Sequence, residues 1–394
     1  MMKYSFFFDL EIAIEIDFFY PMLLPEIIIE KIKNEGPISF QDFMEMALYY
    51  SDLGYYNSKQ DKIGAEGDFY TNSSLSASFG AMLGRQIEEM WQALDKKTFK
   101  IIEYGAGTGL LCHDILDYLK TNADLYKSLT YSIIEKSTSM REIEKTHLTE
   151  KVSWHSSIQE IPQMNACILS NELVDNFAVH QVVMEDQLME IFVDYEHGFK
   201  EVLQPANAAL ITYFEDLNVT LPEGFRTEVN LEAITWIKEV AQWLKKGYVI
   251  TIDYGALSSE LYEIQRHLGT LLCFNKHRIN DNPYQFIGEQ DITTHTNFSA
   301  LKDWGAKYGL KYCGLVNQAN FLLGLGFKEY QDRLVKDKQS NVQLALQESI
   351  INYRLLMDLG TKFKVLIQRK GVSDYPLSGL KFINSAQNLS LNRF

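Results

Sequence analysis

Three alternating glycines, Gly105, Gly107 and Gly109, stand between a short apolar run and a segment whose apolar residues recur every four positions. The run at residues 99–104 predicts a buried strand, and the spacing in residues 110–119 predicts one face of a helix. Glycine lets the backbone turn where a Cβ would be in the way, and the first amides of a helix are unpaired and point outward. The segment predicts a nucleotide cradle; the alternative is a plain turn between a strand and a helix.

Two acidic residues narrow the choice of nucleotide. Glu103 lies two residues before the first glycine, and Glu135 ends a second apolar run at residues 131–134. An acid at the tip of the second strand can accept hydrogen bonds from both ribose hydroxyls of an adenosine. The glycine spacing differs from the dinucleotide fingerprint, and an acid before the first glycine suits an amine better than a pyrophosphate. S-adenosylmethionine carries both an adenosine and an ammonium, so the sequence predicts this cofactor.

Polar residues also end two later apolar runs. Asn171 and Glu172 follow the run at residues 166–170, and Asp253 follows the run at residues 248–252. Ligands of open α/β sheets bind at the carboxyl ends of the strands. We therefore expect these side chains to lie beside the glycine turn, with Asn171 contacting the cofactor.

Glu172, Asp175 and His180 are the candidates for the reaction itself. Methyl transfer from a sulfonium is a direct displacement that needs alignment of the nucleophile and correct placement of charge. Carboxylates bind an arginine guanidinium in a bidentate manner, and Glu172 and Asp175, three residues apart, are predicted to share a face that does so. The alternatives are that Glu172 only caps a strand end, and that His180 is a buried structural histidine rather than a substrate-side group.

A glycine- and aromatic-rich loop at residues 67–71 is a further candidate region. Asp68 and Thr71 are predicted to close over the methionine end of the cofactor. The alternative is that this loop is a turn which fixes the segment before the glycine motif.

The composition and charge of the chain limit the classes of protein to which it can belong. The chain has 394 residues, of which 46% are hydrophobic and 23% charged, as in a globular, core-forming chain. The net charge of −15 argues against nucleic acid as a partner, and it is compatible with a cationic acceptor. The four cysteines are far apart, which favours free thiols in a reducing compartment and no metal site. We expect a cytoplasmic protein with no nucleic-acid or membrane partner; the oligomeric state stays open, with a homodimer as one option.

The alternation of apolar runs and helical periodicities predicts an α/β chain with a doubly wound, largely parallel sheet. Residues 1–21 fit neither a signal peptide nor a transit peptide; they are a disordered extension, a strand, or the product of an upstream start codon with the working start at Met22. We expect antiparallel strands at 179–183, 188–193 and 209–214, and a late strand at 362–368 at an edge or in a hairpin. We predict four units: the N-terminal extension at 1–21, a helical prelude over the cofactor mouth at 22–97, a cofactor-binding core at 98–370 and a C-terminal tail at 371–394. Within the core we expect insertions at about 180–245 and 256–300 and a helical segment at 327–358.

Together these motifs resemble the MidA-like methyltransferases, whose mitochondrial members are protein-arginine methyltransferases that assist assembly of respiratory complex I. The resemblance implies a class I methyltransferase (Rossmann-like) fold and S-adenosylmethionine bound by Glu103, the three glycines and Glu135. It also implies an arginine-bearing protein substrate. Ordered matches run roughly from residue 25 to 370, at residues 67–71, 76, 79–80, 103–111, 114–116, 135–137, 170–175, 179–180, 252–255, 269–271, 291–298, 318 and 321–322.

The sequence departs from the family pattern in two places. Asn72, Ser73 and Ser74 stand where the family usually has Ala-Pro-Glu, and Ala178 stands where it usually has a proline. The first departure removes an acid near the expected substrate entrance. The favoured reading is protein-arginine N-methylation; the alternatives are a small-molecule methyltransferase and a non-catalytic assembly or binding protein that keeps the cofactor fold.

Overall fold

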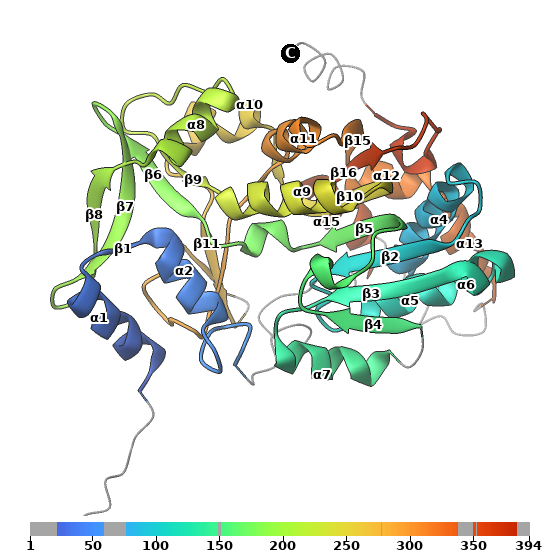
Figure 1. Cartoon of the computed structure of the whole chain (residues 1–394), viewed down its shortest axis with the longest axis horizontal. Helices are drawn as coiled ribbons and strands as arrows, with labels where there is room; N and C mark the ends of the chain where they lie inside the picture. The colour runs from blue at the N-terminus through green and yellow to red at the C-terminus, as the bar shows by residue number, and fades with distance from the viewer. Residues whose placement is uncertain are drawn as a thin grey trace, which may run out of the picture.

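The computed structural model describes residues 22–58, 76–148, 151–276, 278–337, 350–351 and 353–383 (Figure 1). The N-terminal extension lies outside these residues, and so do Asp68, Thr71 and residues 72–74. Their assigned roles stay predictions.

An eight-stranded sheet forms the centre of the described chain (Figure 1). Its strands, in spatial order, are β15 (Lys311–Asn317), β16 (Phe363–Lys370), β10 (Lys246–Ala256), β5 (Asn165–Asn171), β2 (Phe99–Tyr104), β3 (Leu129–Ile134) and β4 (Val152–His155), with β14 (Thr296–Asn297) paired to β10. The strands from β10 to β4 run parallel to one another. The predicted α/β class with a doubly wound, largely parallel sheet is confirmed.

Strand β16 is the exception to the parallel arrangement. It pairs antiparallel with β10 on one side and with β15 on the other, so it lies inside the sheet. The prediction of an edge strand or a hairpin was wrong. Val365, Leu366 and Ile367 are all buried because helices cover both faces of the sheet at this point, and a strand buried on both faces is continuously apolar.

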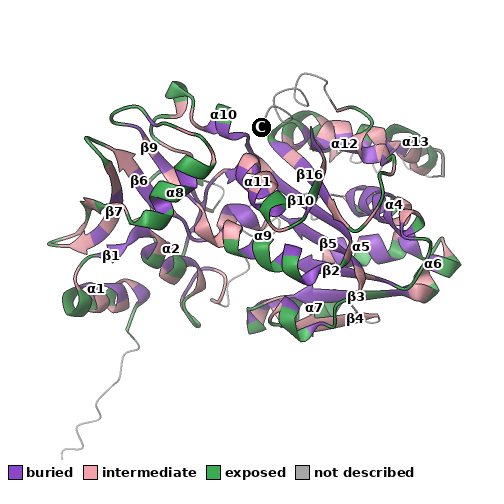
Figure 2. Cartoon of the chain, turned by 45° about the horizontal axis from the view of Figure 1, so that its top comes forward, coloured by how far each residue is buried: buried purple, intermediate pink, exposed green. Residues whose placement is uncertain are grey.

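Alternate residues of each strand face two different helical layers. Ile101 packs in the core that holds α4 (Ala77–Ala93), α5 (Leu110–Leu119), α12 (Gln318–Gly324) and α13 (Phe327–Asp337). Its neighbour Ile102 packs in the core that holds α9 (Leu231–Trp243) and α11 (Phe298–Lys307). In Figure 2 the strands are mostly purple, whereas α9 turns a green, exposed side outward.

A second lobe lies beside the sheet. It contains β1 (Ile38–Ser39), β6 (His180–Met184), β7 (Leu188–Tyr195), β8 (Phe199–Pro205) and β9 (Arg226–Val229), which form an antiparallel sheet, and the smaller sheet of β11 (Leu272–Asn275), β12 (Arg278–Asn280) and β13 (Asp291–Thr293). Helices α1 (Leu24–Glu35) and α2 (Phe40–Tyr49) pack on it, with Phe40, Phe43, Val193 and Ile292 in one buried cluster. The predicted strands at 179–183 and 188–193 therefore correspond to β6 and β7.

The segment at residues 22–97 divides between the two parts of the fold. Helices α1 and α2 belong to the second lobe, and β1 pairs with β7. Helix α4 instead packs against α5 in the core of the central sheet. Figure 1 shows α1 and α2 on the side of the second lobe, beside β1 and β7.

The segment at residues 209–214 is helical, so its prediction as a strand was wrong. It lies in α8 (Ala208–Asp216), where Leu210, Tyr213 and Phe214 are buried at helical spacing. The Asn207 side chain caps the helix by accepting hydrogen bonds from the amides of Ala209 and Leu210, at 2.9 and 3.2 Å. An asparagine at this position is a strong helix start signal.

The remaining elements are short or peripheral. None of the helices in the described ranges has the length and apolar character that crossing a membrane requires. Cys112, Cys167, Cys273 and Cys313 are all free. The further helices are α6 (Ala123–Ser128), α7 (Thr138–His147), α10 (Ser258–Leu261) and α15 (Leu359–Lys362), with single turns at Ile158–Glu160, Val174–Asn176, Ile264–Arg266, Arg354–Asp358 and Ser378–Leu380.

Candidate active site

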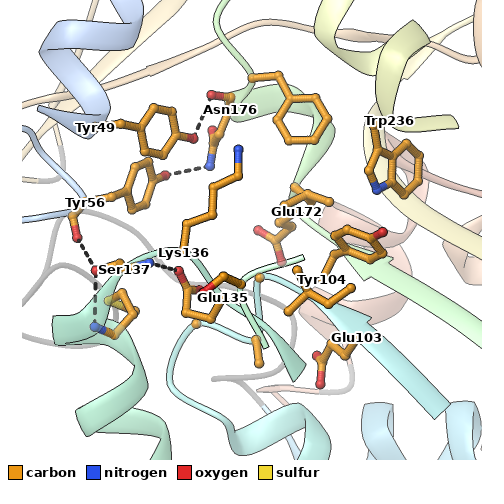
Figure 3. A pocket seen from close by; sticks show the side chains of 18 of the residues that line it. Tyr49, Tyr56, Glu103, Tyr104, Glu135, Lys136, Ser137, Glu172, Asn176 and Trp236 are labelled. Atoms are coloured by element: carbon orange, nitrogen blue, oxygen red, sulfur yellow. Dashed lines mark hydrogen bonds between the residues drawn. The ribbon is translucent and has the colours of Figure 1, made fainter. Parts of the chain in front are cut away.

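A cavity of about 610 Å³ opens at the carboxyl ends of β2, β3 and β5 (Figure 3). The glycine turn, the segment after β3 and the segment after β5 form its wall on the side of the central sheet. Helices α2 and α9 supply further lining residues. This is the edge at which open α/β sheets bind their ligands.

The glycine turn has the backbone conformation that the sequence predicts. Gly105, Gly107 and Gly109 have φ values of 64°, 58° and 80°, which side chains with a Cβ rarely adopt. A Cβ on Gly105 would lie 3.0 Å from Leu173 Cδ1. Gly105 and Gly107 line the cavity, whereas Gly109 is the N-cap of α5 and packs toward α7. Two of the three glycines thus face the ligand space and the third orients the helix.

Glu135 follows β3 directly and lines the cavity. Its Oε1 accepts a hydrogen bond from the amide of Ser137 at 2.7 Å, and Arg141 donates to its carbonyl oxygen at 2.8 Å. Burial raises the pKa of this carboxyl. The carboxylate is therefore fixed in direction and keeps acceptor capacity for a ribose.

We expect Glu135→Ala to weaken cofactor binding roughly tenfold or more, because hydrogen bonds to a charged group contribute about 1.5–3 kcal/mol each. The measurement is calorimetry with S-adenosylhomocysteine and its 2′-deoxy analogue. The analogue should lose most of its disadvantage in the variant. An unchanged penalty for the analogue would show that Glu135 does not bind the ribose.

Glu103 lies on β2 at the floor of the cavity and is fully buried. The hydroxyl of Tyr131 donates a hydrogen bond to its Oε2 at 2.7 Å. Burial raises the pKa of Glu103 to about 7, so the carboxyl changes charge near neutral pH. A nearby ammonium would favour the charged form.

The predicted pairing of Glu103 with the cofactor ammonium has a pH signature. Because the cation binds the deprotonated carboxylate, affinity should rise as pH increases through the pKa of about 7. Between pH 6 and pH 8 we expect the Kd of S-adenosylhomocysteine to fall about tenfold. Glu103→Gln should remove this dependence; the same slope in wild type and variant would assign the titration to another group.

Asn171 ends β5, Glu172 follows it directly, and both residues line the cavity. Glu172 has a φ of 53°, which is uncommon for a residue with a side chain. Its Oε1 accepts a hydrogen bond from Asn171 Nδ2 at 3.1 Å, and its amide donates to the carbonyl of Ile252 at 2.9 Å. These contacts hold the Glu172 side chain toward the cavity (Figure 3).

Asp175 is not at the cavity, so the predicted shared face with Glu172 is absent from the described structure. Asp175 is 3% exposed and lies in the turn at Val174–Asn176, facing Asp253. Asp253 Oδ2 accepts hydrogen bonds from the amides of Val174 and Asp175, at 2.9 and 3.3 Å. Burial raises the pKa of Asp175 above its usual value. The Asp253 carboxylate thus supports the turn that contains Asp175.

His180 also lies outside the residues that line the cavity. It begins β6, and its Nδ1 is 2.6 Å from Glu190 Oε1 in the second lobe. These surroundings match the alternative that His180 is a structural histidine rather than a substrate-side group.

Residues 82–316 match the family described as "Putative S-adenosyl-L-methionine-dependent methyltransferase". The match covers more than half of the chain. The chain belongs to this family. Its activity is S-adenosylmethionine-dependent methyl transfer, and the predicted cofactor and methyltransferase fold are confirmed.

Curated relatives and a solved structure are similar over most of their length. Human protein arginine methyltransferase NDUFAF7, mitochondrial, is 27% identical, with 84% of this chain and 80% of the relative covered. The Drosophila melanogaster homolog is 24% identical, with 89% and 86% covered. A crystal structure of a protein from Burkholderia thailandensis bound to S-adenosyl-homocysteine is 27% identical, with a TM-score of 0.82 over 92% of this chain and 96% of that one.

Four buried polar atoms at the cavity of this methyltransferase have no hydrogen-bond partner within the described residues. They are Asn171 Oδ1, Asn176 Oδ1, the Tyr104 hydroxyl and Trp236 Nε1. Buried polar atoms are nearly always paired in native proteins. Together with the space that a Cβ on Gly105 would fill, these atoms show that the cavity suits a polar ligand such as S-adenosylmethionine.

The wall from α2 and the following loop was not predicted from the sequence. Tyr49 donates a hydrogen bond to the Asn176 carbonyl at 2.9 Å, and Asn176 Nδ2 donates to the Tyr56 hydroxyl at 2.5 Å (Figure 3). Tyr56 in turn donates to Asp291 Oδ1 at 3.0 Å, and the two tyrosine rings stack 5.5 Å apart. Tyr49 and Tyr56 belong to the second lobe, and no motif in the sequence marked either of them as a site residue.

Three glutamates on the same side were also missed. Glu45 lies on α2, and Glu232 and Glu239 lie on α9. Burial raises the pKa of Glu45 and of Glu232, and the charge of Glu232 raises the pKa of Glu45 further. A cation bound in this half of the cavity would therefore stabilise the charged form of these carboxylates.

Proposed function

We propose that this methyltransferase transfers the methyl group to a guanidinium nitrogen of an arginine in a protein. The observation that carries the proposal is the charge of the cavity: six glutamates and one lysine are the charged residues among its described lining. Carboxylates bind the planar guanidinium in a bidentate manner, and aromatic rings stack on it. The names of the mitochondrial relatives, protein arginine methyltransferases, support the same acceptor.

The acceptor half of the cavity has the residues that such a reaction needs. Glu172 lines the cavity directly after β5, and Glu45 on α2 and Glu232 on α9 line it as well. S-adenosylmethionine supplies a methyl group bound to a sulfonium. In the proposal, the Glu172 carboxylate orients the guanidinium and localises a lone pair on the attacking nitrogen, which releases one proton to solvent once it carries the methyl group. Tyr49 and Phe177 border the faces of the guanidinium.

We also propose a protein acceptor in the cytoplasm rather than a nucleic-acid or membrane partner. The net charge of −15 disfavours phosphate backbones and favours a basic protein. Four free cysteines support a reducing compartment.

The proposal is tested on a lysate from a strain that lacks the gene. Purified protein and methyl-labelled S-adenosylmethionine are added, and the label is followed in intact proteins and in the small-molecule fraction. We expect label in protein, released by acid hydrolysis as methylarginine, and none with a variant that binds no cofactor. Label confined to small molecules or to another amino acid would overturn the arginine proposal, and cofactor binding without any transfer would favour a non-catalytic role.

A further inference from the structure

The cavity contains one basic side chain among its described lining residues, that of Lys136. Lys136 follows Glu135 at the end of β3, and Figure 3 shows its side chain extended into the cavity with the amine toward Asn176. Its Nζ lies 3.8 Å from Glu232 Oε1, and the charge of Lys136 lowers the pKa of both Glu232 and Glu45. The ammonium therefore lies in the half of the cavity assigned above to the acceptor.

We propose that Lys136 is a resident counter-ion of the acceptor site, which neutralises its glutamates until a cationic side chain displaces it. The inference rests on the proposed function and adds a specificity determinant to it. The ammonium of Lys136 and an incoming guanidinium are attracted to the same carboxylates, so the two cations compete for them.

The contacts of Lys136 fit displacement. Its side chain is 83% exposed, and the ion pair with Glu232 is long at 3.8 Å. Exposed ion pairs contribute little to stability and are screened by salt. The four-carbon stem is flexible, so the amine can move into solvent while the backbone after β3 keeps its place beside the cofactor.

The exchange discriminates between acceptors. A guanidinium offers a planar fork of donors that matches two carboxylate oxygens, whereas an ammonium is a compact point charge. An arginine therefore gains more from Glu232 and Glu45 than Lys136 loses on leaving. A neutral side chain makes no ion pair with these glutamates that could replace the one with Lys136. Lys136 therefore stays in place and obstructs a neutral acceptor.

The test uses the full chain saturated with S-adenosylhomocysteine and the probe N-acetyl-L-arginine methylamide. Lys136→Met keeps the length of the side chain and removes its charge. We expect it to bind the probe roughly fivefold more tightly than wild type, the scale of a weak exposed ion pair. The matched control is Lys145→Met, which removes an exposed lysine on α7 that pairs with Glu142 at 2.8 Å and does not line the cavity. Its affinity for the probe should equal that of wild type.

The results separate this inference from the proposed function. If both proteins bind the arginine probe, and Lys136→Met binds it no more tightly than wild type, the counter-ion role is overturned and the arginine site is left intact. Failure of both proteins to bind the probe, with S-adenosylhomocysteine still bound, would overturn both proposals. If Lys136→Met bound a neutral citrulline probe more tightly than wild type, to the same extent as the arginine probe, the gain would not depend on a cationic acceptor, and this result would also overturn the counter-ion role.

Discussion

Gly107→Val should abolish detectable binding of S-adenosylhomocysteine while the protein stays folded. Gly107 lines the cavity and has a φ of 58°. A valine there places a branched side chain where the cofactor must approach the backbone, and it strains a left-handed conformation. Calorimetry measures the affinity, and circular dichroism with a thermal melt shows whether the fold survives.

Gly224→Val is the matched control for backbone strain. Gly224 has a φ of 75° in an exposed turn, and a Cβ there would meet nothing within 4 Å. The substitution Gly224→Val therefore imposes the same kind of backbone strain, but away from the cavity. The control should bind the cofactor normally; unchanged affinity in Gly107→Val as well would show that the cofactor does not lie on the glycine turn.

Glu172→Gln should reduce methyl transfer about a hundredfold or more, because a buried guanidinium that loses its charged partner is destabilised by some 3–5 kcal/mol. Cofactor affinity should change less than twofold, under ~0.5 kcal/mol. Glutamine keeps an oxygen that can accept the hydrogen bond from Asn171 Nδ2, so the end of β5 should keep its geometry. The measurements are a binding isotherm and a single-turnover rate on the acceptor found in the lysate.

Glu185→Gln is the comparison variant, since Glu185 is exposed in the turn between β6 and β7, away from the cavity lining. It should transfer methyl groups at the normal rate. Loss of cofactor binding in Glu172→Gln would assign Glu172 to the cofactor pocket or the fold. A normal transfer rate would remove the main support for an arginine acceptor.

The cofactor side of the site could be predicted because its signals are local. The glycine turn, and the acids Glu103 and Glu135 at two strand ends, each follow from a few consecutive residues and from the rule that parallel strands end together. The placement of Asp175 could not be predicted this way. A spacing of three shares a face on a helix, but Glu172 has a left-handed φ of 53° and Asp175 lies in a single tight turn.

The acceptor wall depends on long-range packing. Tyr49 and Glu45 come from α2, which joins the second lobe, and Glu232 comes from α9, far along the chain. Their periodicity predicts helices, but no short-range pattern shows which helix end faces the sheet. The interior position of β16 was missed for the same reason, since pairing partners in a sheet are not encoded by the strand alone.

The interior position of β16 also constrains the order in which this chain can fold during synthesis. Strand β10 ends at Ala256, yet its antiparallel partner begins only at Phe363, 107 positions later. Until the ribosome has delivered that segment, the open sides of β10 and β15 expose unpaired amides and carbonyls, which are templates for association with other chains. Domains generally fold as units as they emerge during translation, but here the main sheet cannot close until Phe363–Lys370 has emerged from the ribosome. The nascent chain therefore passes through a long interval in which two strand edges are open to association with other chains.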